Sequence, residues 1–331
     1  MTRGPRRFTF WAVPCSLILA ACAGSPSVLD PRGPGARRIE GLWWLMLWIS
    51  VAVFLVVLGF LVAAYAKGLS RKPASRSEVR WGEPLVIVGG IVAPGLILGA
   101  VFVVALRDMS ALSEPPGEPG VTIEVVGHDW WWEARYPGGA VTANEIHIPV
   151  GEPVQLELTS DDVIHSFWVP QLQAKTDLIS GQTNEMWIQA DEAGTFRGQC
   201  AEFCALQHAN MIFYVIAEPR SEFDDWLANE ASDAPGPVGS AAARGEDVFL
   251  SSDCAGCHAI RGTDADATVG PDLTHLAARK TIGAGVLDNT RDNLAQWILD
   301  PQGVKPGVTM PPTELSADEL DALLDYLEEL E

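Results

Sequence analysis

The segment Cys200–Met211 places soft metal ligands at short spacing. Cys200 and Cys204 stand four residues apart, the imidazole of His208 follows four residues later, and a thioether comes three beyond it. Thiolate and thioether suit copper and zinc, and imidazole suits either metal. A structural zinc site would use a closer Cys spacing and no Met. One blue copper needs a single Cys. Two thiolates can instead bridge two copper ions, with one His on each metal.

The second imidazole has to come from another segment. His165, in the run Asp-Asp-Val-Ile-His-Ser-Phe-Trp-Val-Pro over 161–170, is the best candidate. This run and the later Cys-x-Glu-x-Cys-x-x-x-His-x-x-Met run together resemble the dinuclear CuA site of cytochrome c oxidase subunit II. The resemblance implies six CuA ligands: His165, Cys200, the backbone carbonyl of Glu202, Cys204, His208 and Met211.

Glu202 has a second role in the family that the chain resembles. Its side chain there binds a magnesium or manganese ion at the boundary with the catalytic subunit. The resemblance therefore implies a Mg site shared with subunit I, whose remaining ligands would lie on that other chain. The family also has a proton-feeding carboxylate near the second membrane span. Glu78 and Glu83 do not match its spacing to Pro94, so we do not assign that role.

A second cofactor motif is Cys254-Ala-Gly-Cys257-His258. Cys-x-x-Cys-His is the attachment run of c-type haem, in which both thiols add to the vinyl groups and the His ligates iron. Met310 is the only Met after this motif and is the predicted distal ligand, with His275 as its rival. Met/His ligation keeps the reduction potential of a haem high. With its downstream Gly-Pro-Asp-Leu run, this third of the chain resembles a small class I cytochrome c.

The aromatic segment His128-Asp-Trp-Trp-Trp-Glu resembles the one near CuA in subunit II. The family has, at the position of Trp130, the tryptophan through which electrons enter from cytochrome c. The resemblance thus implies this role for Trp130. The family usually has Gln where this chain has Asp129. We expect Trp131 and Trp132 to be ordinary core or membrane-facing side chains.

Composition limits the classes of partner. The chain has 331 residues, 48% of them hydrophobic, which is enough for at least two domains. A net charge of −21 disfavours nucleic acid as a partner and favours a cationic protein surface. Four of the six cysteines fall in cofactor motifs and one in the lipid-attachment motif described next. Only Cys15 is unassigned, so we expect no structural disulfide.

Residues 1–22 have the pattern of an export signal, with three arginines before a short apolar run. The run ends in Leu-Ala-Ala-Cys22, which resembles the bacterial lipoprotein cleavage box. That resemblance implies that Cys22 is diacylated and becomes the mature N-terminus, attached to membrane lipid. Ordinary cleavage near Ala23 is the alternative.

Two uncharged runs follow, at about 42–65 and 85–106, within a predicted transmembrane hairpin that covers residues 23–110. Each run is long enough to cross about 30 Å of hydrocarbon. Five Lys and Arg residues lie between them, which places that loop in the cytoplasm and both chain ends outside. We therefore expect a multi-pass protein of the bacterial plasma membrane, with its cofactor domains on the outer, periplasmic face.

Residues 118–230 show a β pattern. Val154–Thr159 alternates apolar and polar residues, and Met211–Ile216 is a buried-strand run. Such strands predict an all-β sandwich or barrel, and the resemblance to subunit II implies a cupredoxin-like sandwich. The metal loop would lie between two late strands, where a rigid sheet limits changes in copper geometry.

A linker at 231–240 leads to the predicted cytochrome c domain at 241–331, a small all-α unit. Its closing helix should begin at the N-cap Ser316, with Glu319 completing a capping box. The chain is thus predicted to be a multidomain membrane protein: a transmembrane hairpin, a cupredoxin-like CuA domain and a class I cytochrome c domain.

Together these features resemble cytochrome c oxidase subunit II with a fused cytochrome c, the caa-type architecture. The resemblance implies a relay in which the haem accepts electrons from an upstream donor, such as a cytochrome c or a cytochrome bc complex. Electrons then pass through CuA to subunit I, where oxygen is reduced and protons are pumped. Subunit III would be a further partner. The chain is then a subunit of an enzyme, and the oxygen-reducing site is on another chain.

Two alternatives remain open at this point. A free-standing membrane electron carrier would hold the same cofactors without an oxidase, although a two-helix anchor suits packing on a larger membrane subunit. A copper-delivery or assembly factor would bind copper transiently and would have no use for the haem motif. A nitrous oxide reductase is excluded, because its second copper domain needs more than the six histidines present.

Overall fold

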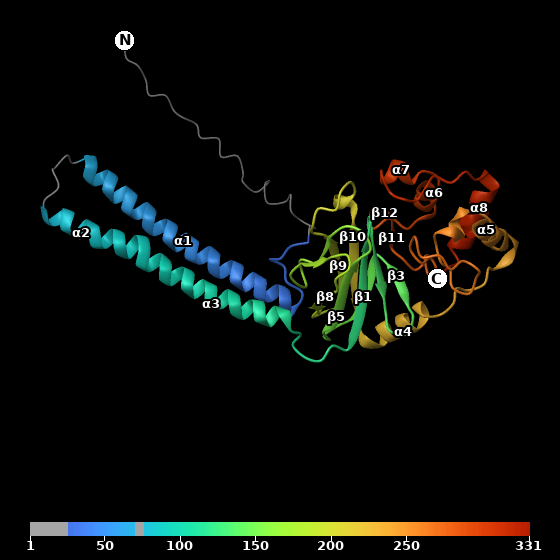
Figure 1. Ribbon diagram of the computed structural model, residues 1–331, viewed down its shortest axis with the longest axis horizontal. Helices are drawn as coiled ribbons and strands as arrows, with labels where there is room; N and C mark the ends of the chain where they lie inside the picture. The colour runs from blue at the N-terminus through green and yellow to red at the C-terminus, as the bar shows by residue number, and fades with distance from the viewer. Residues whose placement is uncertain (1–25, 70–75) are drawn as a thin grey trace, which may run out of the picture.

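Three structural units follow one another along the chain: a helical hairpin, a β-sandwich and a small helical domain (Figure 1). The computed structural model describes residues 26–69 and 76–331. The predicted export signal, including Cys15 and Cys22, lies outside the described residues. The order of the units agrees with the fold class expected from sequence.

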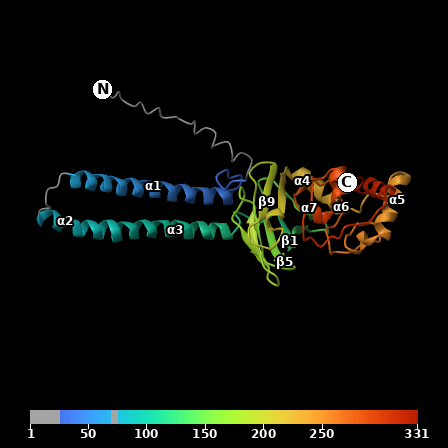
Figure 2. The same cartoon turned by 90° about the horizontal axis from the view of Figure 1, so that it is seen from above.

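The hairpin consists of two long helical arms that run side by side in both views (Figures 1 and 2). Its elements are α1 (Pro34–Leu69), α2 (Arg76–Ile87), the π-helical turn η3 (Val88–Val92) and α3 (Ala93–Ser113). Both arms are long and apolar enough to cross a membrane, and their large apolar side chains are mostly exposed. The second arm departs from regular α-helix at η3, just before Pro94. Proline has no N–H to donate to a helical hydrogen bond, and the wider π-helical turn accommodates this loss.

The sandwich comprises two five-stranded sheets. The first sheet has the order β3-β2-β1-β5-β8 and the second has the order β4-β10-β9-β6-β7. The strands are β1 (Val121–His128), β2 (Trp131–Arg135), β3 (Val141–Ala143), β4 (Glu145–Pro149), β5 (Val154–Ser160), β6 (His165–Trp168), β7 (Thr176–Leu178), β8 (Asn184–Ile188), β9 (Gly194–Cys200) and β10 (Ile212–Glu218). Most pairs are antiparallel, but β1 with β5 and β4 with β10 are parallel.

Alternating burial places the sandwich core between the two sheets. In β5 every second side chain is fully buried, as the period-two pattern predicts. The aromatic rings of Trp132, Phe167 and Phe213 meet near the centre of this core, with ring centroids 4.4–5.8 Å apart. Tilted and edge-on ring contacts of this kind add to the free energy of hydrophobic burial. The core therefore gives a rigid support to the strand ends that carry the metal ligands.

The start of α1 is attached to the sandwich. The amide of Arg32 donates to the carbonyl of Gln171 at 2.7 Å, and the amide of Ala36 donates to the carbonyl of Leu172 at 3.0 Å. Arg37 forms an ion pair with Asp191. These contacts satisfy helix N-terminal N–H groups and fix the direction in which the hairpin leaves the sandwich.

The last third of the chain is mostly helical. A helix after β10, α4 (Arg220–Glu230), closes the sandwich, and the coil that follows is shorter than predicted because α5 already begins at Gly239. The remaining elements are α5 (Gly239–Ser251), β11 (Thr281–Ile282), β12 (Leu287–Asp288), α6 (Arg291–Leu299), α7 (Pro301–Val304) and α8 (Ala317–Leu327), with the 3₁₀ turns η4 (His208–Asn210) and η5 (Asp253–Gly256). The predicted capping box of α8 is present. This helix packs on α5, where the rings of Phe249 and Tyr326 meet edge-on.

Candidate metal and haem sites

The predicted copper ligands come from two neighbouring strands and the loop between β9 and β10. Strand β6 pairs with β9 so that Phe167 lies opposite Cys200, which brings His165 beside the start of the loop. The antiparallel pairing of β9 with β10 then returns the chain to Met211. The loop is short, so its side chains have little freedom to leave the end of the sandwich.

These side chains form one buried cluster. The two sulfur atoms of Cys200 and Cys204 are 3.7 Å apart, so the thiols are close but not joined in a disulfide. Cys200 Sγ lies 3.9 Å from His165 Nδ1, and Cys204 Sγ lies 3.6 Å from His208 Nδ1. The Sδ atom of Met211 is 3.9 Å from Cys204 Sγ. Each thiol therefore has an imidazole nitrogen beside it, as a dinuclear copper site requires.

The two thiols share their protons unequally. A hydrogen bond from Cys204 stabilises the thiolate of Cys200 and lowers the pKa of Cys200 well below its ordinary value. The same contact, together with burial, raises the pKa of Cys204. A thiolate is the form that binds metal, and a bound cation displaces the remaining proton. The donor set of two thiols, two imidazoles and a thioether thus fits copper.

Asp162 orients the imidazole of His165. Its Oδ1 lies 2.8 Å from His165 Nε2, and the carboxylate also accepts hydrogen bonds from the amides of Val163 and Asp129, each at 2.6 Å. A metal-binding His commonly donates its second nitrogen to a carboxylate in this way, which sets the tautomer and the ring direction. Gly127 makes room for the same ring, because a Cβ atom there would lie 2.8 Å from His165 Cδ2.

Glu202 contributes its backbone and its side chain in different directions. Its carbonyl oxygen lies 3.1 Å from Cys200 Sγ, at the edge of the buried cluster. Its side chain is exposed, and its carboxylate accepts a hydrogen bond from the amide of Phe203 at 3.2 Å. The carbonyl is thus placed to join the copper ligands, while the carboxylate is free to face another chain.

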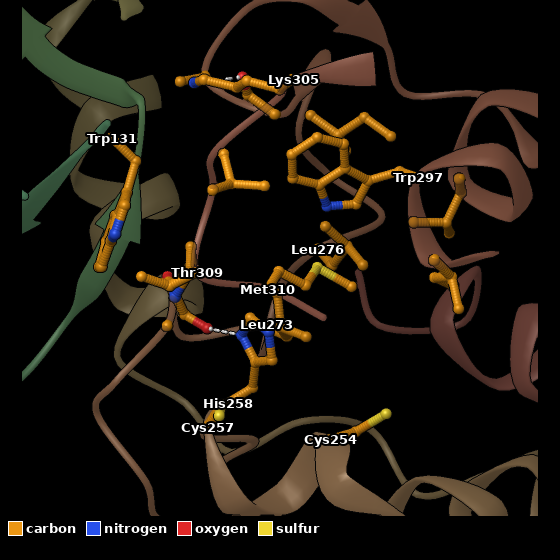
Figure 3. Close-up of a pocket in the computed structure, with 18 of the residues that line it drawn as sticks. Trp131, Cys254, Cys257, His258, Leu273, Leu276, Trp297, Lys305, Thr309 and Met310 are labelled. Atoms are coloured by element: carbon orange, nitrogen blue, oxygen red, sulfur yellow. Dashed lines mark hydrogen bonds between the residues drawn. The ribbon is translucent and has the colours of Figure 1, made fainter. Parts of the chain in front are cut away.

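The haem motif lines a cavity of about 220 Å³. Figure 3 shows Cys254, Cys257, His258 and Met310 around this cavity, although they come from separate segments. The Nδ1–H of His258 donates to the carbonyl of Pro271 at 2.7 Å, which leaves Nε2 free to act as a ligand. Burial lowers the pKa of His258, which favours the neutral form that binds iron.

The rival distal ligand, His275, is placed elsewhere. It is buried, and its two ring nitrogens lie near the carbonyls of Glu331 and Ser232, at 2.7 and 3.3 Å. It does not line the haem cavity, whereas Met310 does. The geometry therefore favours Met310 over His275.

Arg279 provides a further test of whether the cavity fits a haem. This guanidinium is 8% exposed and lines the cavity, and one of its nitrogens donates to the carbonyl of Asp272. Its Nε has no hydrogen-bond partner among the described residues. A buried, partly unpaired cation beside a mostly apolar cavity suits an anionic group such as a haem propionate. The residues present thus fit the expected group.

The comparisons with known proteins agree with both sites. Family models described as "Cytochrome C oxidase subunit II, periplasmic domain" and "Cytochrome c" match residues 139–218 and 242–331. Cytochrome c oxidase subunit 2 of Alkalihalophilus pseudofirmus is 38% identical over 95% of this chain and 94% of its own length. The chain belongs to the cytochrome c oxidase subunit 2 family.

Other relatives have the same description. Cytochrome c oxidase subunit 2 of Bacillus subtilis is 29% identical over 95% of this chain and 94% of that one. A solved structure of the periplasmic domain of cytochrome oxidase subunit II from Bradyrhizobium japonicum is 30% identical, covers 34% of this chain and 95% of that chain, and has a TM-score of 0.34. As a subunit 2 with a cytochrome c domain, the chain is part of an oxidoreductase complex.

The match to the subunit II family model contains every predicted copper ligand. It does not include the tryptophans at 130–132, whose positions come from the structure alone. Trp130 is buried, and its Nε1–H donates to the carbonyl of Cys204, one of the predicted copper ligands. Trp132 lies in the sandwich core as expected. The prediction for Trp131 is wrong. Its ring stacks on His128 and lines the haem cavity from the sandwich side (Figure 3).

The reason for this difference is tertiary. The cytochrome domain docks on the sandwich, so side chains of β2 that would otherwise be exposed become part of the haem cavity. The segment before Met310 also contacts the copper loop, where the Nε2–H of Gln207 donates to the carbonyl of Pro306 at 2.7 Å. Two cofactor loops that are about 100 residues apart in sequence therefore lie in contact.

Sequence reasoning missed three residues of the sites. Trp131, Arg279 and Lys305 all line the haem cavity. Their sequence signal was a cation or an aromatic residue near a cofactor motif, which is too weak for a prediction: Arg279 is followed by Lys280, and Trp131 is the middle residue of a run of three tryptophans. Lys305 had the clearest one, because it is a lone charge between Val304 and a proline, five residues before the predicted haem ligand.

Proposed function

We propose that this subunit 2 takes electrons from an upstream donor at its own haem c and delivers them through Trp130 and CuA to subunit I of a respiratory haem-copper oxidase. Cys254 and Cys257 would attach the haem, and His258 and Met310 would ligate its iron. When bound, the haem and the copper pair supply reversible one-electron redox chemistry. Oxygen reduction and proton pumping take place in subunit I.

One observation carries this proposal: Trp130 touches both sites. It lines the haem cavity, and its indole donates to the carbonyl of Cys204. An aromatic side chain that bridges the two sites gives a short covalent and hydrogen-bonded route between them. The Met310 segment packs on the copper loop beside it. The rigid sandwich core holds the copper ligands in place and so limits the reorganisation that accompanies a change of oxidation state.

The partners and orientation are also proposals. The exposed carboxylate of Glu202 would complete a magnesium site with ligands from subunit I. The two helical arms would cross the bacterial plasma membrane and pack on subunit I, with subunit III as a further neighbour. The sandwich and the cytochrome domain would then lie on the outer, periplasmic face, where a cytochrome c or a cytochrome bc complex acts as the donor. Cys22 would add a lipid anchor.

Electron paramagnetic resonance of the full-length purified protein tests the copper part. We expect a multi-line signal from one unpaired electron shared by two coppers, and loss of that pattern in Cys204→Ser. Cys257→Ser, which affects the haem alone, is the matched control and should keep the copper signal. A single-copper spectrum in the wild-type protein would exclude the relay.

Purification from membranes separates this function from the two alternatives. We expect the chain to co-purify with a many-helix haem protein, and we expect the complex that contains Trp130→Phe to lose oxygen-reducing activity. A free-standing carrier would purify alone with both cofactors present. A copper-delivery factor would purify without the mixed-valence copper signal.

A further inference from the structure

Lys305 is a buried amine at the boundary between the two cofactor domains. It is 2% exposed, and its Nζ donates to the carbonyl of Trp130 at 2.7 Å and to that of Gly283 at 3.0 Å. The first carbonyl belongs to the sandwich and the second to the cytochrome domain. No carboxylate pairs with Lys305 among the described residues. Burial lowers the pKa of Lys305 to about 7, because desolvation disfavours the charged form.

Glu145 contacts the cytochrome domain from the sandwich side of the same boundary. It belongs to β4 of the sandwich, is 3% exposed, and its Oε1 accepts hydrogen bonds from the cytochrome domain. The donors are the amides of Lys280 and Thr281, at 2.8 and 3.1 Å, and the hydroxyl of Thr281 at 3.4 Å. A carboxylate in such a dry position is stable only while these donors stay in place.

Lys305 and Glu145 are thus buried polar side chains, one from each domain, whose partners include the backbone of the other domain; Gln207 of the sandwich adds a further contact of this kind, to the carbonyl of Pro306. An apolar interface alone would tolerate sliding, since hydrophobic contacts have no direction. Two buried hydrogen-bonding groups prevent sliding, because a small shift of one domain leaves an amine or a carboxylate without its hydrogen-bond partner. The two contacts lie on different segments of each domain, so together they fix a rotation as well as a distance.

The position of Lys305 relates this interface to electron transfer. It precedes the haem ligand Met310 by five residues, and it holds the backbone of Trp130, the residue whose indole reaches Cys204. Lys305, Trp130 and Cys204 thus form a continuous chain of hydrogen bonds from the cytochrome domain to the copper loop. Glu145 holds the segment on the other side of the cavity, next to Ile282.

We propose that Lys305 and Glu145 are positioning residues that lock the cytochrome domain on Trp130 in a single orientation and so set the rate of electron transfer between the two cofactors. The inference rests on the proposed relay. One electron passes from the ferrous haem to the oxidised copper pair in this step. No bond or proton changes hands at either locking residue.

The test uses the assembled oxidase. Lys305→Met keeps most of the side-chain volume and removes the amine, and Glu145→Gln removes the carboxylate charge. After rapid reduction of the haem, its reoxidation and the reduction of CuA are followed by their separate absorption bands. We expect the transfer rate to fall by about tenfold or more in each variant, as loss of a buried hydrogen bond would give. The static spectra of both cofactors should not change.

Matched controls come from exposed residues of the same type. Lys280→Met keeps the backbone amide that Glu145 accepts from, and Glu157→Gln changes an exposed position of β5; both should retain the wild-type rate. If Lys305→Met loses its haem spectrum through misfolding, Glu145→Gln tests the same lock from the sandwich. Unchanged rates in both locking variants would overturn the inference.

Amide hydrogen exchange of the complete complex gives a readout that does not depend on electron transfer. Peptides that contain Lys280–Ile282 should exchange faster in Lys305→Met, although the substituted residue lies outside them, because both contacts belong to one interface. Wild-type protection in that variant would mean that Lys305 does not lock the domains. If the wild-type complex passes no electron from haem to copper, the proposed relay is wrong. Faster amide exchange in Lys305→Met would still show that Lys305 holds the two domains together.

Discussion

At the scale of single residues, the copper cluster shows how burial prepares a metal site. Cys200, Cys204, His165 and Met211 are all at most 4% exposed, so their polar atoms depend on protein partners or a bound metal in place of water. The hydrogen bonds that join them in this structure mark the positions of lone pairs that a metal would use. Outside the cluster, Asp162 is the charged group in direct contact with His165, at Nε2, the ring nitrogen that does not face Cys200.

Asp162→Asn should weaken copper binding by about 10–100-fold, because the partner that orients His165 loses its charge. Copper content after dialysis against a graded series of chelator concentrations measures this. Asp161→Asn is the control, since that neighbouring side chain is 63% exposed and does not contact the imidazole of His165. Equal copper retention in the two variants would contradict the role of Asp162.

Met310→Ala should change the axial ligation of the haem and lower its reduction potential, because a Met ligand keeps the potential high. His275→Ala should leave both unchanged, since His275 lies outside the haem cavity. A redox titration with absorption spectra of the full-length protein measures ligation and potential together. The opposite pattern, with only His275→Ala affected, would reassign the distal ligand.

At the scale of elements, α8 shows a helix start that sequence alone defines. The hydroxyl of Ser316 accepts a hydrogen bond from the amide of Glu319, and the carboxylate of Glu319 accepts one from the amide of Ser316. The face of α8 that carries Leu323 and Leu327 then lines the haem cavity. A defined start therefore sets which leucines reach the cofactor.

Ser316→Ala should destabilise the cytochrome domain by about 1 kcal/mol, because the first turn of α8 loses its capping hydroxyl. Chemical unfolding followed by haem absorption measures the difference. Ser221→Ala, at an exposed position in α4, should have no such effect. A haem transition that stays at the wild-type denaturant concentration in Ser316→Ala would show that the cap does not limit stability.

At the scale of the whole molecule, the three units are joined at short, polar contacts. Glu230 ends α4, where the sandwich meets the cytochrome domain; it is 4% exposed, and its Oε1 has no hydrogen-bond partner among the described residues. Burial raises its pKa above the ordinary value of 4.5, although Arg279, His275 and Arg261 act in the opposite direction. The folded chain therefore binds a proton at this position more tightly than the unfolded chain does.

Glu230→Gln should accordingly raise the thermal midpoint at pH 7–8. The raised pKa means that wild-type Glu230 contributes its full stability below pH 4.5 and loses it as the pH rises through the folded-state pKa. The advantage of the variant should thus be greatest at neutral pH and should disappear below pH 4.5. Glu222→Gln, exposed on the same helix, controls for the change in net charge. An advantage that grows on acidification would contradict the assigned sign.

Sequence alone determined the features that depend on local spacing. The ligand types around Cys200 and Cys254, the two apolar runs, the alternation in β5 and the capping box of α8 all follow from residues close together in the chain. Their structure is set by covalent reach and by helix or strand periodicity, so a linear pattern is sufficient. His165 could also be predicted as a copper ligand, because the run over 161–170 that contains it resembles the subunit II family.

Only the tertiary structure decided what lies between the two cofactor sites. Trp131 had the pattern of a core residue, and Lys305 and Glu145 had that of ordinary surface charges. Their roles arise because the cytochrome domain docks on the sandwich and removes them from water. Such burial is a property of two surfaces far apart in sequence, and no local spacing encodes it. The physical reason is that a hydrogen bond across an interface depends on the arrangement of whole domains.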